Sequence, residues 1–230
     1  MGEDLRARNW LYERSLKVDL IDLTFGLQAL VTLLVIMDPP GATPLFLSLV
    51  SAKPMREQRK LAWQAAITSF IVITLFAIFG QWILDYLKIS LPALKGAGGL
   101  LLLLVALELL KGDGSREAGR RSGNVALVPL GTPLLAGPGA IVAIMLFVQE
   151  ASTSSNPLDQ SIQWNRYLAL ALAVVIVHLI IGLTLMYSTK IVAVIKESGV
   201  ELLARIAGLL LAAIAVEMLV SAIREFFPTI

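Results

Sequence analysis

Residues 37–46 read Met-Asp-Pro-Pro-Gly-Ala-Thr-Pro-Leu-Phe, and this stretch decides what kind of fold the chain can adopt. It interrupts an apolar run that extends from residue 20 to residue 50. Proline removes a backbone donor and clashes with the preceding turn, and glycine loosens the chain further. A carboxylate, Asp38, stands at the same place, where a membrane makes it costly unless it faces protein or water. The pattern therefore predicts a membrane helix that is broken near its middle.

A second stretch repeats this interruption later in the chain. Residues 135–140 place Leu-Ala-Gly-Pro-Gly-Ala inside another apolar run, residues 125–149. Its Pro-Gly-Ala tripeptide matches that of the first stretch with a shift of 98 residue numbers. Interrupted membrane helices at corresponding places of two halves point to a transporter binding site. Two proline kinks that only improve packing remain the alternative, because kinked helices are common in membranes.

The composition is that of an integral membrane protein. The chain has 230 residues, 57% hydrophobic and 16% charged, with mean hydropathy +0.80, whereas soluble domains have about 25% charged residues. It has no cysteine, which excludes disulfides and thiolate metal sites. The basic residues do not gather with aromatic residues into a patch, so nucleic-acid binding is not expected. No catalytic, metal or cofactor motif is apparent, and we expect neither an enzyme nor a cofactor.

Six apolar runs, each long enough to cross about 30 Å of hydrocarbon, predict six transmembrane helices. They lie at residues 20–50, 61–84, 91–110, 125–149, 166–188 and 200–223, with the first and fourth broken and a polar, interfacial segment at 1–19. The sequence around Gly99 and Glu108 recurs around Gly208 and Glu217, with a shift of 109 residue numbers. Because each copy holds an odd number of helices, the second copy is inverted in the membrane. We expect one all-α polytopic domain, 20–230, of two inverted three-helix repeats, about 20–111 and 125–224.

Basic residues in short loops predict how the chain is oriented. Of 19 Lys and Arg residues, eleven lie in the loops after the first, third and fifth spans. The other eight lie on the opposite side, and four of those belong to the N-terminal tail. We therefore expect a multi-pass protein of the cell membrane with both termini on the non-cytoplasmic side.

Each break exposes backbone groups that suit a small ligand. The N-terminus of the second half-helix offers free amides, which attract a carboxylate. The end of the preceding half-helix offers carbonyls, which suit an ammonium group. A zwitterionic amino acid presents both groups within a few ångströms. The expected substrate-binding set spans both breaks: Asp38, Pro40, Gly41, Ala42, Thr43, Thr132, Gly137, Gly139 and Ala140.

Asp38 and His178 are candidates for coupling transport to a proton or a sodium ion, because both are ionisable and stand within apolar runs. Each of these two residues can instead have a structural role. Asp38 is placed to cap the helix after the break by accepting from the Gly41 amide. A lone histidine in a span more often forms a hydrogen bond across a helix interface. Both interpretations remain open for each residue.

Glu108 and Glu217 are the other acids in the apolar runs, nearer the helix ends. They are further candidates for ion coupling. The alternative is a structural role at the membrane interface. Glu108 is spaced to pair with Lys111 one turn later, and Glu217 with Arg224 two turns later.

These motifs resemble those of a known family. Residues 37–46 resemble the first-half motif of the MarC family of bacterial inner-membrane proteins. Val128-Pro-Leu-Gly-Thr-Pro-Leu-Leu-Ala-Gly-Pro-Gly-Ala-Ile141 resembles its second-half motif, and the resemblance runs from about Leu20 to Arg224. It implies a six-helix protein of the inner membrane that transports small neutral amino acids such as glycine and alanine, like the SnatA-type members. An exporter of another small solute and a non-transporting membrane scaffold remain alternatives, and oligomeric state is unknown.

Overall fold

The computed structural model describes residues 23–50, 53–111, 135–152 and 160–227, and every regular element within these ranges is a helix. Residues 23–37 form the first helix. It is followed by α2 (Pro39–Val50), α3 (Met55–Leu87), α4 (Leu91–Lys111), α7 (Pro138–Ser152), α8 (Gln160–Met186) and α9 (Ser188–Phe226). The predicted all-α fold class is confirmed for the described part of the chain.

Five helices in the described ranges are long and apolar enough to cross a membrane. They are Leu23–Thr43, Met55–Leu87, Leu91–Lys111, Trp164–Met186 and Glu201–Phe226. Helix α7 is also apolar but has only 15 residues. The first part of the fourth predicted span, residues 125–134, and the N-terminal segment at 1–19 lie outside the described residues. The helices that are described make this a polytopic membrane protein.

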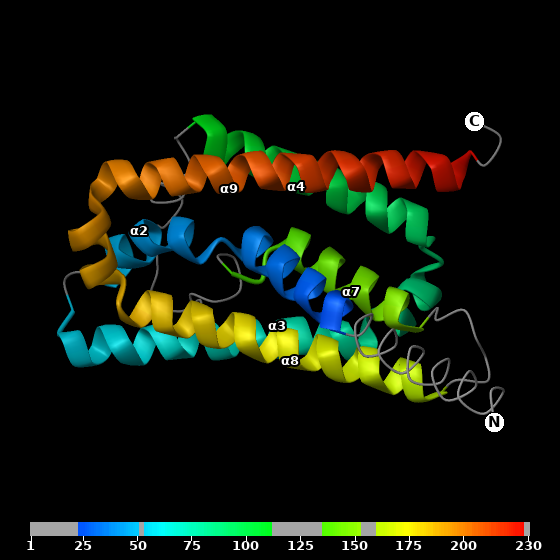
Figure 1. Ribbon diagram of the computed structural model, residues 1–230, viewed down its shortest axis with the longest axis horizontal. Helices are drawn as coiled ribbons and strands as arrows, with labels where there is room; N and C mark the ends of the chain where they lie inside the picture. The colour runs from blue at the N-terminus through cyan, green and yellow to red at the C-terminus, as the bar shows by residue number, and fades with distance from the viewer. Residues whose placement is uncertain (1–22, 51–52, 112–134, 153–159, 228–230) are drawn as a thin grey trace, which may run out of the picture.

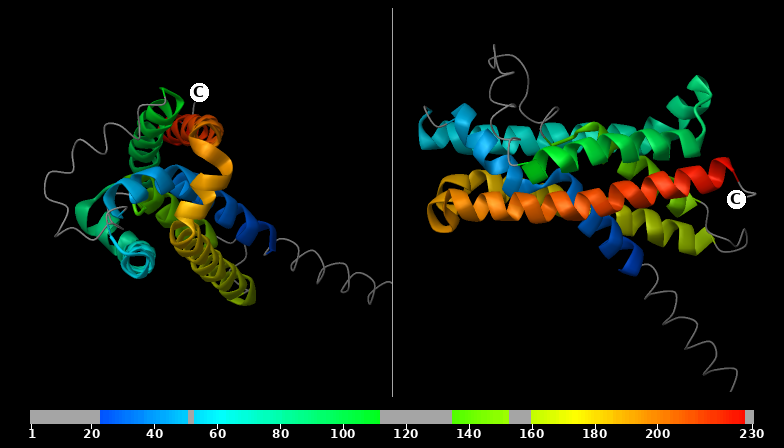
Figure 2. Two further views of the ribbon diagram at one scale, coloured as in Figure 1. Left: turned by 90° about the vertical axis from the view of Figure 1, so that its left-hand side faces the viewer. Right: turned by 90° about the horizontal axis from the view of Figure 1, so that it is seen from above.

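The helices run side by side along the long axis of the molecule and form three layers (Figure 1). Helices α4 and α9 pack together as one outer pair, and α3 and α8 pack together as the other. Helices α2 and α7 lie between the two pairs, and the helix at residues 23–37 is tilted, so that its start projects from the bundle (Figure 2). The first break and the described part of the second segment, residues 135–152, therefore lie near the centre of the bundle.

The main core fills the space between the broken helices and the α3–α8 pair. Its fully buried side chains include Leu33, Phe46, Ile73, Ile144 and Ile181. Large apolar side chains also cover the outside, as at Ile78, which is 65% exposed. A surface of this kind suits lipid. Because lipid is as apolar as these side chains, close packing rather than the exclusion of water holds the helices together.

Glycine lets α4 and α9 approach each other closely. A Cβ atom at Gly99 would lie 2.9 Å from the carbonyl oxygen of Ala215 on α9. A Cβ atom at Gly208 would lie 3.1 Å from the carbonyl oxygen of Ala106 on α4. Larger residues at either position would separate the two backbones, and membrane helices commonly use small residues at such contacts.

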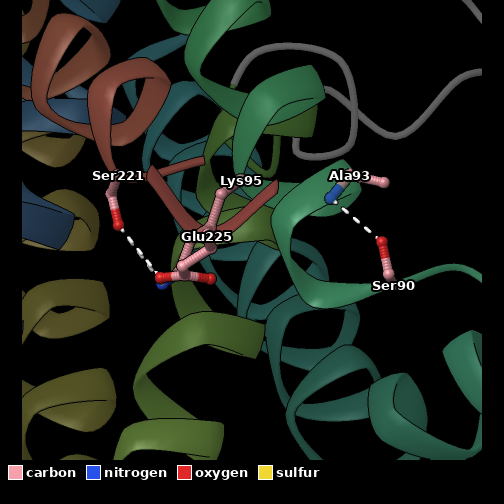
Figure 3. Close-up of polar contacts among 5 residues, drawn as sticks. All are labelled: Ser90, Ala93, Lys95, Ser221 and Glu225. Carbon is pink, nitrogen blue, oxygen red and sulfur yellow. Dashed lines mark hydrogen bonds and ion pairs between the residues drawn. The ribbon is translucent and has the colours of Figure 1, made fainter. Parts of the chain in front are cut away.

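A tight turn joins α3 to α4 at one end of the bundle. Lys88 adopts a left-handed conformation with φ 55°, and its amide donates to the Asp85 carbonyl oxygen at 3.2 Å. The hydroxyl of Ser90 then accepts from the Ala93 amide at 3.4 Å (Figure 3). This is the geometry of a helix N-cap, so Ser90 marks the start of α4.

The same end of the bundle holds an ion pair between distant parts of the chain. Lys95 of α4 pairs with Glu225 of α9 (Figure 3). The Lys95 ammonium also donates to the Ser221 hydroxyl at 3.4 Å, and that hydroxyl donates to Glu225 at 3.1 Å. The Lys95 side chain is 21% exposed and that of Glu225 is 38% exposed, so the pair is only partly shielded from water, and it connects α4 to the end of α9.

Helix α9 begins earlier than its apolar run predicts. Its continuity is broken at Lys196, whose φ of 61° and ψ of 167° are not helical. Residues 188–195 therefore form a separate segment that crosses from α8 to the long part of α9 (Figure 1). The membrane-length part starts at Glu201, close to the predicted residue 200.

Candidate functional site

The structure brings the two breaks together at the centre of the bundle. The first break is at Asp38, the non-helical residue between the helix at 23–37 and α2. The second is the turn at residues 135–137 that precedes α7. The Cγ2 atom of Ile36 lies 3.7 Å from the position that a Cβ atom would take at Gly139. Segments about a hundred residues apart in sequence thus meet, as two matched broken helices predict.

At the first break, Asp38 caps α2. Its backbone is left-handed, with φ 39°, and its Oδ1 atom accepts from the Gly41 amide at 3.2 Å. Its carbonyl oxygen accepts from the Ala42 amide at 2.9 Å. Pro39 and Pro40 have no N–H to offer. The start of α2 therefore has no free amide, and the capping interpretation of Asp38 is confirmed.

Thr43 and Ala42 are buried next to this cap rather than exposed to an open space. The Thr43 hydroxyl donates to the Pro39 carbonyl oxygen at 2.9 Å, which satisfies its hydrogen-bonding need within the helix. Pro40 is only partly buried and supplies no donor. None of these three residues offers a free polar side chain, so the Asp38 carboxylate is the polar side chain of the first break.

The second break has the opposite chemistry. The carbonyl oxygen of Gly137 accepts from the amides of Ala140 at 3.0 Å and Ile141 at 3.2 Å. Pro138 has no N–H, and the Gly139 amide has no acceptor among the described residues. Since the first amides of a helix carry partial positive charge, the start of α7 attracts an anionic group. Among the described residues, the start of α7 has an amide without an acceptor and the start of α2 has none, whereas the sequence pattern predicted free amides at both.

The surroundings of the second break differ between its two glycines. A Cβ atom at Gly137 would meet no atom of the described residues within 4 Å, so this side of the turn is open with respect to them. Gly139 and Ala140 are buried, and a Cβ atom at Gly139 would overlap the Leu102 side chain of α4. Sequence reasoning missed Leu102, because nothing in a leucine-rich span distinguishes one leucine from its neighbours. The predicted site residue Thr132 lies outside the described residues.

His178 forms a hydrogen bond across the α3–α8 interface. Its Nδ1 atom lies 2.7 Å from the Val174 carbonyl oxygen, which can only accept, so Nδ1 carries the proton. Its Nε2 atom lies 3.2 Å from the Ser69 hydroxyl, which donates to it when the imidazole is neutral. The edge of the ring packs against Phe70, with ring centroids 5.4 Å apart. Both nitrogens have partners in α3 or α8, as the structural interpretation requires.

Glu108 and Glu217 do not lie at the breaks. Both side chains are exposed, and neither forms an ion pair with a residue in the described ranges. The predicted pairing with Lys111 and Arg224 was therefore wrong. The sequence spacing allows these pairs, but a pair forms only when both long side chains adopt matching rotamers, which costs conformational entropy. The cross-helix pair of α9 uses Glu225, which packs against α4 beside Lys95.

The chain is similar to known membrane proteins over most of its length. The family model described as MarC family integral membrane protein matches residues 23–227. A UPF0056 membrane protein of Methanocaldococcus jannaschii is 36% identical over 211 residues, which cover 89% of this chain and 98% of that protein. One from Archaeoglobus fulgidus is 33% identical, covering 88% of this chain and 94% of that protein. YvbG of Bacillus subtilis is 26% identical, covering 90% and 98%. No solved structure matches the chain.

Proposed function

We propose, for a chain that belongs to the MarC family of integral membrane proteins, a role as a secondary transporter of small neutral amino acids such as glycine and alanine. The observation that carries this proposal is the complementary chemistry of the two breaks. One presents the Asp38 carboxylate, and the other presents, at a helix N-terminus, the Gly139 amide, which has no acceptor in the described part of the chain. An amino acid carries a positive and a negative group that match them.

The proposed orientation of the substrate follows from which polar groups at the breaks already have hydrogen-bond partners. The substrate carboxylate binds the Gly139 amide, where the α7 dipole favours negative charge. The ammonium group binds Asp38, because only its Oδ1 atom is occupied by Gly41. Gly137 is partly exposed and adds no side-chain bulk to the approach, whereas Ala140 is buried. The remaining residues of the first break, Pro40 to Thr43, hold Asp38 in place rather than touch the ligand.

Contacts between α4 and α9 support an inverted repeat. Gly99 faces the Ala215 carbonyl oxygen and Leu219, while Gly208 faces the Ala106 carbonyl oxygen and Leu110. A shift of 109 residue numbers converts each member of the first set into one member of the second. Reciprocal contacts of this kind arise when two equivalent helices meet across a twofold axis.

A contact between α3 and α8 is a second observation that supports a twofold axis between the two repeats. Ser69 and His178, which share a hydrogen bond, are also 109 residues apart in sequence. Equivalent positions touch each other only where a twofold axis passes between them. Two inverted three-helix repeats, with six spans in total, account for both interfaces. Motion of one repeat against the other would open the central site to each side of the membrane in turn.

A proton or a sodium ion supplies the driving force in this proposal, with Asp38 as the coupling residue. Asp38 is the carboxylate at the centre of the site, whereas His178 uses both ring nitrogens in structural hydrogen bonds. Glu108 and Glu217 remain secondary candidates, since each is exposed on an apolar helix. Carboxylates in such positions are expensive in lipid unless they carry a function or meet a partner.

We place the protein in the cell (inner) membrane with both termini on the non-cytoplasmic side. At one end of the bundle, the start of α3 carries Arg56, Arg59 and Lys60, all exposed. At the other end, Trp82 and Tyr86 stack on each other, 68% and 76% exposed. Basic residues favour the cytoplasmic side, and exposed aromatic residues favour the level of the lipid headgroups.

Transport in liposomes tests the proposal. Purified protein is reconstituted and tested with labelled glycine, alanine and other amino acids under imposed proton or sodium gradients. We expect saturable uptake of the small neutral substrates above that of empty liposomes. Uptake of a different solute class alone would support the alternative of another small-solute exporter. No uptake under any gradient, together with no effect of changes at the breaks, would favour a membrane scaffold.

A further inference from the structure

The two breaks have equivalent glycines whose free faces are covered by different groups. Gly41 and Gly139 occupy matching places in the Pro-Gly-Ala motifs. Beside Gly41, the place where a Cβ atom would lie is filled by the Oδ2 atom of Asp38. Beside Gly139, the same place is filled by the Cδ2 atom of Leu102. The two coverings are thus a carboxylate at one break and a methyl group at the other.

The first break shows how a carboxylate sits on such a glycine. One oxygen of Asp38 accepts from the Gly41 amide at 3.2 Å, and the other oxygen lies over the glycine Cα. At the second break, Ala136 stands where the motif has Asp38, so the chain supplies no carboxylate of its own there. A substrate carboxylate that bound Gly139 in the same manner would place its second oxygen in the position of the Leu102 methyl group.

We propose that Leu102 is a specificity-determining residue: its side chain occupies the substrate-carboxylate position at the second break and must turn away before an amino acid binds. This inference rests on the proposed amino-acid site. Leu102 is 2% exposed and packs in a cluster with Ala106, Leu211 and Ala215, so the displaced side chain must find room within a packed interface. The displacement costs binding free energy, and the substrate must fit into the space that the side chain vacates.

Two consequences follow for affinity and selectivity. Shortening Leu102 removes the cost of displacement, so small substrates bind more tightly. It also enlarges the vacated space, so that an amino acid with a branched side chain gains affinity relative to alanine. A purely structural role for Leu102 predicts neither effect, because the loss of packing would weaken the fold without improving binding.

The experiment compares the wild-type protein with Leu102→Ala by calorimetric titration of glycine, alanine and valine in detergent. We expect severalfold tighter binding of alanine to the variant and a larger relative gain for valine. A destabilised or misfolded variant would bind alanine more weakly, so a gain in affinity cannot result from a loss of stability. Leu211→Ala is the matched control, since Leu211 is equally buried, at 1% exposure, in the same cluster.

The outcomes separate the two proposals. If the wild type binds alanine and Leu102→Ala binds it no more tightly, the role of Leu102 is overturned while the amino-acid site stands. An equal gain in Leu211→Ala would also overturn it, because loosening of the cluster would then be the cause. If the wild type binds none of the three amino acids while remaining folded, the proposed function fails and the inference fails with it.

Discussion

At the scale of single residues, Asp38 combines a structural role with a proposed binding role, and two substitutions separate them. Asparagine keeps an oxygen that accepts from the Gly41 amide, so Asp38→Asn should leave thermal stability nearly unchanged. It removes the charge that binds the substrate ammonium, and the loss of one partner of a buried charge pair costs about 2 kcal/mol or more. Calorimetric titration with alanine should show this loss, and unchanged affinity would leave Asp38 as a cap alone.

Asp38→Ala removes the cap as well as the charge. Loss of an N-cap typically costs about 1 kcal/mol, so this variant should unfold at a lower temperature than Asp38→Asn in a thermal unfolding assay. Equal stability of the two variants would show that the hydrogen bond to Gly41 contributes little to the fold.

The two glycines of the second break should respond differently to substitution. A valine at Gly137 enters open space, whereas one at Gly139 overlaps Leu102. Gly137→Val should therefore keep the wild-type melting temperature and lose alanine binding, because its branched side chain fills the approach to the Gly139 amide. Gly139→Val should lower the melting temperature, since overpacking typically costs about 1–3 kcal/mol. If Gly137→Val is folded and binds alanine with wild-type affinity, the substrate does not lie beside this break.

At the scale of helices, the close contact of α4 with α9 makes one glycine of α4 far less replaceable than another. A Cβ atom at Gly99 would lie 2.9 Å from the Ala215 carbonyl oxygen, whereas one at Gly96 would lie 3.6 Å from Ala222, an ordinary contact. Alanine is a better helix former than glycine by about 1 kcal/mol. Gly96→Ala should therefore preserve or raise the melting temperature, and Gly99→Ala should lower it. Equal melting temperatures would contradict the close approach.

At the scale of the whole molecule, the described helices predict a topology that two cysteines on one helix can test. The native chain has no cysteine, so single-cysteine variants need no background correction. Arg56 and Lys88 lie at opposite ends of α3, about 48 Å apart along a continuous helix, and both are exposed. In intact cells, Lys88→Cys should react with an impermeant maleimide and Arg56→Cys should not. The reverse labelling would invert the orientation, and labelling of both would mean that α3 does not span the membrane.

The interruptions and most of the helices were predictable from sequence because their causes are local. Proline and glycine break a helix whatever surrounds it, and a run of about 20 apolar residues suits the membrane wherever it occurs. The short segment at residues 188–195, which precedes the long part of α9, was not predictable in the same way. The break at Lys196 depends on a left-handed backbone at a residue type that rarely adopts it, and no composition signal marks it.

The sequence by itself determined that the chain spans a membrane, that a break lies at Asp38, and that a matching Pro-Gly-Ala motif stands at the start of α7. Only the tertiary structure decided what covers Gly139. The cap of Asp38 on Gly41 is a contact over three residues that the sequence already offered, whereas Leu102 lies over Gly139 because α4 packs against α7. The partners of His178 and of Lys95 were likewise decided by packing, since they lie 109 and 130 residues away. Local chemistry sets where helices break, but contacts between distant helices set which groups remain open to a ligand.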